Sequence, residues 1–284
     1  MSEIHFFKRS IFVTHPCRSE YKPTPPDRSH TKVDHFSKKS RRRLQFVVVN
    51  NSHKLISQFG LTYHNDWPTD GADCKKHLNR LLTYLRQNYP GINYLWIMEF
   101  QTRKAPHYHL FLDIEPDRKF QEVIAKKWNK ILQEDDQHLA FHNHPTNFIS
   151  WDMGSGSYLT KYLDKDHQKT VPQNYNNFGR FWGHTRALKP VPIACDLDDL
   201  EDLATIDKET GEIYGGKTQV LRWLGRYHRR ATNGFSKFYI RAHHFSALMM
   251  DGIKIYNQIE NYFYDKNYVD NSQGFRSWSE ASPG

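Results

Sequence analysis

Residues 94–112 read YLWIMEFQTRKAPHYHLFL, two apolar runs on either side of a short basic segment. Aromatic and aliphatic residues favour strands, and a connection as short as QTRKAP joins neighbouring strands as a β-hairpin. Glu99 is an acidic residue within the otherwise apolar first run. Antiparallel pairing of the two runs would bring its carboxylate beside His107 and His109 of the second run.

Strand-like and helical patterns surround this hairpin on both sides. Upstream, LQFVVVN at 44–50 and ISQFGLTYH at 56–64 have the composition of strands, and residues 71–89 have the period of an amphipathic helix. Downstream, residues 116–133 are again helical by period. FISWDM at 148–153 is a further strand candidate, and GSGSYLTKYLDK at 154–165 is expected to form a short helix.

The order strand, strand, helix, strand, strand, helix, strand, helix predicts an α+β domain with a largely antiparallel central sheet. We expect helices packed on one face of the sheet, with the other face left free for a substrate. Three parts are expected along the chain. They are a basic arm at 1–43 with a Pro-rich stretch, a catalytic domain at 44–190, and a mostly helical extension at 191–284 whose basic helix is a candidate DNA contact.

The composition favours a polyanionic partner. The chain has 40 lysines and arginines against 31 aspartates and glutamates, a formal net charge of +9, and nucleic acid is the commonest partner of so basic a protein. No apolar run approaches the roughly 20 residues of a membrane-spanning helix, and the N-terminal residues lack the apolar core of a signal peptide. We therefore expect a soluble, cytoplasmic protein with no membrane partner.

Cys17, Cys74 and Cys195 lie far apart and form no CxxC pair. This spacing signals neither a disulfide framework nor a zinc ribbon, and it fits a reducing compartment. The 17 histidines and the 14% aromatic content suit metal binding and base stacking alike. Because histidine is so frequent, a single histidine motif carries little weight without its context.

Basic residues gather in three segments that could contact DNA. One ends the arm, one forms the hairpin turn, and one lies on a basic amphipathic helix expected at 218–230. For the arm and the C-terminal helix, an equally good interpretation is a solvated surface with no specific role. The candidates are Lys38, Lys39, Arg41, Arg42, Arg43, Arg103, Lys104, Arg222, Arg226, Arg229 and Arg230.

His107 and His109 are two residues apart in a predicted strand, so both imidazoles project from one face, about 7 Å apart at their Cα atoms. A second such pair, His142 and His144, lies in HNHP, a loop-like composition. Two imidazoles with the Glu99 carboxylate leave open positions and suit Mg²⁺ or Mn²⁺ better than a closed zinc site. The alternatives are an exposed histidine pair and an ion pair between Glu99 and Arg103 or Lys104.

The segment SYLTKYLDK places two phenols and two ammonium groups on neighbouring positions of a helix. A tyrosine with a pKa near 10 is a poor nucleophile at neutral pH, so a nearby cation helps to stabilise the phenolate or the phosphate charge. The alternative is an amphipathic helix with half-buried tyrosines. The candidate catalytic residues are Tyr158, Lys161, Tyr162 and Lys165.

Together these segments resemble a known family. An acidic strand residue, then APHYHLFL, then YLTKYLDK some fifty residues later, is similar to the motif order of HUH-superfamily rolling-circle replication initiators, in particular the two-tyrosine type of plasmids and single-stranded DNA phages. GLTYHNDWP resembles the strand of the first motif. The resemblance covers residues 44 to about 185. Its one departure is Tyr108, where the family usually has a bulky apolar residue.

This resemblance implies an RRM-like α+β fold and a site-specific endonuclease. By analogy Glu99, His107 and His109 hold the metal, and Tyr158 or Tyr162 attacks a phosphodiester, which gives a 5′-phosphotyrosyl link and a 3′-hydroxyl primer. Lys161 and Lys165 would stabilise phosphate or phenolate. The implied partner is single-stranded DNA at a replication origin, with a hairpin there, and a host helicase and polymerase are further candidate partners. Rejoining would end replication.

Two other functions stay open at this point. A transposase or relaxase can use the same metal and tyrosine parts, although the chain has neither a helicase-sized extension nor a Cys-rich zinc module. A non-catalytic nucleic-acid-binding protein would use the histidines and tyrosines only as contacts. Substitution of Tyr158 and Tyr162 by Phe separates the last alternative from the enzymes, because only an enzyme forms a covalent adduct.

Overall fold

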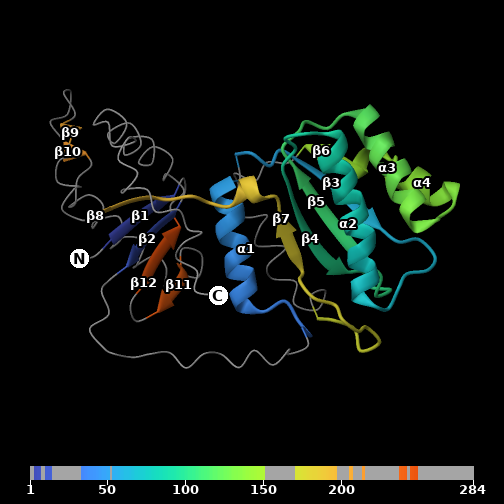
Figure 1. Ribbon diagram of the computed structural model, residues 1–284, viewed down its shortest axis with the longest axis horizontal. Helices are drawn as coiled ribbons and strands as arrows, with labels where there is room; N and C mark the ends of the chain where they lie inside the picture. The colour runs from blue at the N-terminus through green and yellow to red at the C-terminus, as the bar shows by residue number, and fades with distance from the viewer. Residues whose placement is uncertain are drawn as a thin grey trace. The chain divides into compact units, whose positions relative to one another are not determined.

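The computed structural model describes residues 3–7, 10–14, 33–51, 53–150, 170–196, 205–206, 213–214, 237–241 and 244–248. The chain divides into two compact units, coloured along the chain in Figure 1. One unit comprises residues 26–44 and 51–189, and the other comprises 1–25, 45–50 and 190–284. The boundaries that the sequence suggested for an arm, a catalytic domain and an extension stay predictions.

A five-stranded sheet forms the centre of the unit that contains residues 51–189. Its strands are β3 (Ser57–Thr62), β4 (Tyr94–Phe100), β5 (Pro106–Leu112), β6 (Phe148–Ser150) and β7 (Trp182–His184). They follow the order β6-β3-β5-β4-β7, and each neighbouring pair is antiparallel. The predicted α+β class with a largely antiparallel sheet, including the β4–β5 hairpin, is confirmed.

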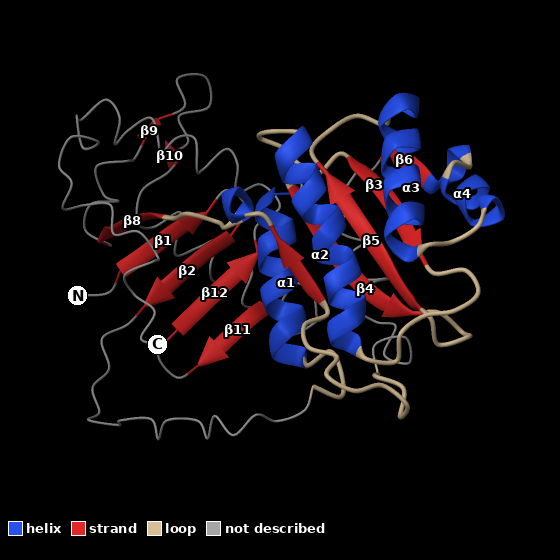
Figure 2. Ribbon diagram, turned by 45° about the vertical axis from the view of Figure 1, so that its right-hand side comes forward, coloured by secondary structure: helices blue, strands red, loops and turns tan. Residues whose placement is uncertain are grey.

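Helices α2 (Gly71–Asn88) and α3 (Arg118–Leu132) pack on one face of this sheet (Figure 2). Both begin at an aspartate whose carboxylate accepts a backbone N–H of the first turn, which satisfies a donor that the helix cannot. The predicted apolar stripe of α2 is buried at Leu78, Leu81, Leu82 and Leu85. Short helices α4 (Asp136–His142) and η1 (Pro145–Asn147) follow α3, and η3 (Arg186–Leu188) follows β7.

The alternation of β5 assigns its side chains to the two faces. Tyr108 is fully buried, donates its hydroxyl to the carbonyl of Cys74 in α2 at 3.3 Å, and meets Trp128 of α3 edge to face. Since neighbouring residues of a strand point to opposite faces, His107 and His109 project away from the helices. Tyr108 therefore fills the helix-side slot that the sequence comparison had left as a departure.

The face opposite α2 and α3 is not free along its whole length, which corrects the expectation of an uncovered sheet face. Leu95, Ile97 and Phe111 share that face and are 0 to 2% exposed. Trp182 of β7 lies opposite Ile97, and its indole N–H donates to Ser40 of helix α1 (Lys38–Asn51) at 2.9 Å. The open part of this face therefore lies toward His107 and His109, which are only half-buried.

Residues 44–50 belong to helix α1, so the prediction of a strand there is wrong. Leu44, Val47, Val48 and Asn51 are buried, and their spacing of three, four and seven residues is that of one helix face. Burial of this stripe outweighs the strand preference of the valines. The neighbour of β3 expected from 44–50 is instead β6, which pairs Phe148 with Phe59.

The other unit contains a second antiparallel sheet, in the order β11-β12-β2-β1-β8. Its strands are β1 (Glu3–Phe7), β2 (Ser10–Thr14), β8 (Ile193–Asp196), β11 (Lys237–Arg241) and β12 (His244–Leu248), and β9 (Thr205–Ile206) pairs separately with β10 (Ile213–Tyr214). Strands β1 and β2 thus lie within the predicted arm. The helix expected at 218–230 lies outside the described residues.

Among the helices that the structure describes, none has the length and apolar character needed to cross a membrane.

Candidate functional site

The β4–β5 register gathers Glu99, His107 and His109 on one sheet face. Glu99 lies directly opposite His107, and His109 lies one pair further along. The Glu99 carboxylate oxygen Oε2 is 3.4 Å from His109 Nε2, and the two imidazole rings are 4.5 Å apart at 84° to each other. Three groups predicted from widely spaced letters of the sequence therefore form one cluster.

Glu99 is 4% exposed and lies in an apolar strand. A buried carboxylate needs a partner, and the sequence left Arg103 and Lys104 open for that role. The structure places His109 beside the carboxylate. Arg103 donates to the carbonyls of Tyr63 and His64 and lies 5.0 Å from the Trp67 ring. Its guanidinium is therefore engaged with the backbone after β3, and His109 is the group that meets the Glu99 carboxylate.

Strand β3 contributes a glycine to this face. Gly60 lies opposite His109, and a Cβ atom on it would stand 2.5 Å from Asn147 Oδ1 and 3.5 Å from His107 Cε1. Asn147, at the end of η1, donates its amide to the carbonyls of Gly60 and His142. A glycine is therefore needed for Asn147 to approach the histidines without a clash.

Gln58, two residues before Gly60, lies on the same sheet face. Its amide Nε2 is 2.9 Å from His109 Nδ1. Sequence reasoning did not single out Gln58, Gly60 or Asn147. For the first two the signal was available, because residues at period two along ISQFGLTYH share one face once β3 is paired with β5.

The donor chemistry of the cluster fits a divalent ion. In the described part of the chain, no three His, Cys, Asp or Glu side chains are already arranged as a metal-binding group. Two N or O donors, each about 2.1 Å from one ion, lie about 3.4 Å apart at the tetrahedral angle. The contact between Glu99 Oε2 and His109 Nε2 measures 3.4 Å, so this pair is spaced as two ligands of one ion would be.

The second His-x-His pair is built differently. His142 ends helix α4 and is fully buried, so it is not a loop residue as its sequence context suggested. Its Nε2 accepts the backbone N–H of Thr62 at 3.1 Å, and burial lowers its pKa from 6.5 to about 4. His144 is exposed, and its ring accepts the N–H of Thr146 in η1. His142 is thus committed to the fold.

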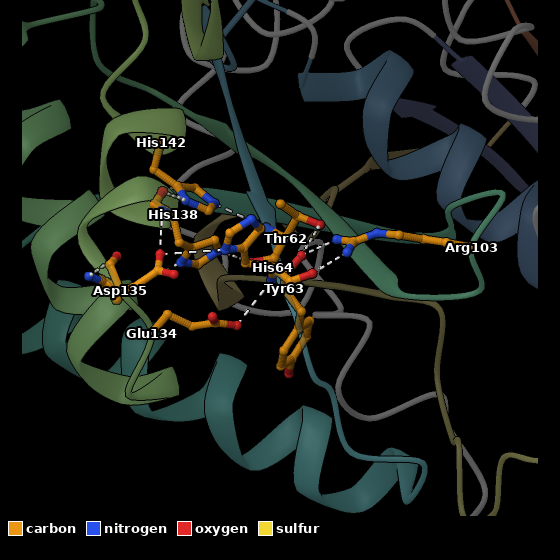
Figure 3. A network of polar contacts seen from close by, with 9 residues as sticks. Thr62, Tyr63, His64, Arg103, Glu134, Asp135, His138 and His142 are labelled. Carbon is orange, nitrogen blue, oxygen red and sulfur yellow. Dashed lines mark hydrogen bonds and ion pairs between the residues drawn. The ribbon is translucent and has the colours of Figure 1, made fainter.

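Figure 3 shows how the end of β3 is held next to the site. The Thr62 carbonyl accepts the indole N–H of Trp128 at 2.8 Å and contacts His138 Nε2 at 2.9 Å. Burial also lowers the pKa of His138. Since Thr62 lies opposite His107 in the sheet, this buried network fixes the strand that borders the candidate site.

The segment after β3 is anchored as well. The His64 N–H donates to Glu134 at 3.0 Å, and its ring lies 3.4 Å from the Asp135 carboxylate (Figure 3). Arg103 joins this segment to the β4–β5 turn through two carbonyls. The turn and the segment after β3 therefore form one rim at the Glu99 and His107 end of the sheet.

Of the predicted DNA contacts, the described ones lie on α1, which begins at Lys38, and on the β4–β5 turn. Lys39, Arg42, Arg43, Arg103 and Lys104 are exposed. Arg41 donates its Nε–H to the carbonyl of Phe36 at 2.9 Å. The remaining candidates lie outside the described residues: Tyr158, Lys161, Tyr162, Lys165, Arg222, Arg226, Arg229 and Arg230.

Residues 57–167 match a protein family described as replication-associated protein, of the ORF2 type. The match covers β3 to β6, the cluster of Glu99, His107 and His109, and the segment 158–165. It spans less than half of the chain. No curated protein and no solved structure matches the chain. The similarity supports a replication initiator that acts at origin DNA, which is the broader part of the prediction from sequence.

Proposed function

We propose that the protein is a replication initiator endonuclease that nicks single-stranded origin DNA with a tyrosine nucleophile. The observation that carries the proposal is the cluster of Glu99, His107 and His109 on two adjacent strands, within a segment similar to replication-associated proteins. The narrower identity, an HUH initiator of the two-tyrosine type, rests on the sequence motifs. Its site is the open end of the sheet face opposite α2 and α3.

Glu99, His107 and His109 would hold a divalent ion, Mg²⁺ or Mn²⁺. When bound, the ion supplies Lewis-acid polarisation of the scissile phosphate. The chain contributes the placement of the ligands. The β4–β5 register fixes Glu99 against His107, and the contacts of Thr62 hold the bordering strand. Ligands on paired strands keep their geometry better than ligands on a loop.

The chemical step assigned to Tyr158 or Tyr162 is a transesterification. The phenol oxygen bonds to phosphorus while the bond from phosphorus to the 3′ oxygen breaks. The phenol proton ends on the released 3′ oxygen, so the products are a 5′-phosphotyrosyl link and a 3′-hydroxyl primer. The reverse step rejoins strands without ATP, because the ester bond is conserved. Lys161 and Lys165 would stabilise the phosphate or phenolate charge.

The test is incubation with single-stranded oligonucleotides of mixed sequence and Mn²⁺, followed by denaturing electrophoresis and mass mapping of DNA-bound peptides. We expect a covalent adduct on the peptide spanning 158–165, and none in the double variant Tyr158→Phe, Tyr162→Phe. The double variant should still bind DNA. An adduct that maps elsewhere, or DNA binding with no adduct from wild-type protein under any Mn²⁺ concentration, would favour the non-catalytic binding protein.

A further inference from the structure

The ring of His109 is held at both of its nitrogen atoms. Gln58 Nε2 lies 2.9 Å from Nδ1, and Glu99 Oε2 lies 3.4 Å from Nε2. The two partners come from strands on opposite sides of β5, since β3 carries Gln58 and β4 carries Glu99. The His109 ring is therefore positioned by the sheet on both edges.

A histidine can bind an ion tightly only if its ring is oriented before the ion arrives. The partner of the second ring nitrogen provides that orientation, and loss of such a partner typically weakens metal affinity by about 10- to 100-fold. Gln58 contacts Nδ1, the nitrogen that faces away from Glu99. It is thus placed to keep Nε2 directed toward the carboxylate.

A glutamine suits this position because its amide has a donor and an acceptor. When Nδ1 accepts, the amide presents its NH₂ group, as the 2.9 Å contact from Nε2 has it. When Nε2 binds an ion, the neutral ring carries its proton on Nδ1, and the same amide can turn its oxygen toward that proton. A side chain with only one of these functions cannot serve both states.

The surroundings of Gln58 support a polar role rather than a packing role. Its cross-strand neighbours, Phe111 on β5 and Ile149 on β6, are apolar. The side chain is half-buried, so part of its amide is removed from water. A half-buried amide is stabilised by a hydrogen bond, and His109 provides one.

We propose that Gln58 is a positioning residue that orients His109 and thereby sets the divalent-ion affinity of the Glu99, His107 and His109 site. The inference deepens the proposed function and rests on it for the identity of the site. Gln58 lies outside the acidic, histidine and tyrosine residues on which the sequence resemblance depends. It does not touch the reacting atoms in this assignment and acts through His109.

The experiment compares Mn²⁺ affinity, measured by EPR of free Mn²⁺, in full-length wild type and three variants. Gln58→Met keeps the side-chain shape and removes the hydrogen bond, and Gln58→Glu keeps an acceptor for a proton on Nδ1. Gln87→Met changes an exposed glutamine of α2 and serves as the matched control. We expect about 10- to 100-fold weaker binding for Gln58→Met, near wild-type binding for Gln58→Glu, and no change for the control.

A second readout does not depend on metal. In the metal-free protein, the ¹⁵N chemical shifts of the His109 ring report which nitrogen carries the proton. We expect Gln58→Met to change the His109 shifts and to leave those of His142 as in wild type. Circular dichroism and thermal melting confirm that each variant is folded, so a loss of affinity is not a loss of structure.

The outcomes separate this inference from the proposed function. Unchanged Mn²⁺ affinity and unchanged His109 shifts in a folded Gln58→Met protein overturn the role of Gln58, even if the wild type nicks DNA. Weakened Mn²⁺ binding in that variant supports the role even if no nicking is found. A wild-type protein that binds no Mn²⁺ overturns the metal site and the affinity effect together.

Discussion

The two His-x-His pairs of this chain have the same spacing and opposite surroundings. On β5, His107 and His109 project from a part of the sheet face that is open, with Glu99 beside them. At the end of α4, His142 is fully buried and bonded to the Thr62 N–H, while His144 is exposed next to η1. The pattern alone does not assign a function. The strand or helix that carries it, and the partner of each nitrogen, do.

The largest expected effect comes from the β5 pair. The change His109→Asn should reduce strand scission by at least about 100-fold, because it removes a ligand beside Glu99 and the ion then stabilises less phosphate charge. The rate of adduct formation on single-stranded DNA measures this. The thermal stability should change little, and scission at the wild-type rate would remove His109 from the site.

The same kind of change in the other pair should affect the fold. The change His142→Ala leaves the buried Thr62 N–H without its acceptor and opens a cavity, which should cost about 2 to 4 kcal/mol of unfolding free energy. Urea denaturation measures it. Once corrected for the folded fraction, scission should match wild type. A variant as stable as wild type would show that the buried contacts of His142 do not stabilise the fold.

Acid should act on the buried pair through the fold. Burial lowers the pKa of His142 to about 4 in the folded protein, against 6.5 for an ordinary histidine, so the unfolded chain binds more protons between these values. Stability is therefore highest above pH 6.5 and falls as the pH drops toward 4, by an amount on the order of 3 kcal/mol from this residue. Unfolding free energies from pH 7.5 to 4.5 test this, and His142→Gln should flatten the curve. An unchanged slope in that variant contradicts the assignment.

Gly60 connects the two pairs, because Asn147 bonds both to its carbonyl and to that of His142. A methyl group at Gly60 would press on Asn147 and approach His107. The change Gly60→Ala should therefore cost about 1 to 2 kcal/mol in stability and lower scission by roughly tenfold. Denaturation and adduct formation measured on the same preparation test it. Gly91→Ala is an unsuitable control because its φ is +88°.

The smallest effect is expected at His144. The ring of this exposed residue contacts Thr146 of the short helix η1, and its backbone carbonyl, which a substitution keeps, accepts the amide of Gln121. The change His144→Asn should alter stability by less than about 0.5 kcal/mol and leave scission unchanged. It is the spacing-matched control for His109→Asn. An effect as large as that of His109→Asn would make the two pairs equivalent and would end the comparison.

The hairpin and the α2 stripe could be predicted because their signals are local. Two seven-residue runs rich in apolar and aromatic residues, joined by a short turn, specify β4 and β5, and the leucines of 78–85 repeat at helical spacing. Residues 44–50 were misread because three consecutive valines favour a strand locally. The buried stripe of Leu44, Val48 and Asn51 that makes them a helix depends on packing elsewhere in the fold.

Within the site, the residues with strong chemical signatures were found and the supporting ones were not. Glu99, His107 and His109 are distinctive in an apolar hairpin. Gln58 and Asn147 acquire meaning only from contacts with residues 51 and 87 positions away in sequence. The assignment of the phenols at Tyr158 and Tyr162 stays a prediction from sequence.

The central claim, a divalent ion held by the β5 histidines and Glu99, is tested most directly by pulsed EPR of Mn²⁺ bound to the protein with ¹⁵N-labelled histidine. We predict magnetic coupling from directly bound imidazole nitrogens that is reduced in His109→Asn and retained in His144→Asn. Bound Mn²⁺ without imidazole coupling, or coupling that is lost in His144→Asn instead, would contradict the account.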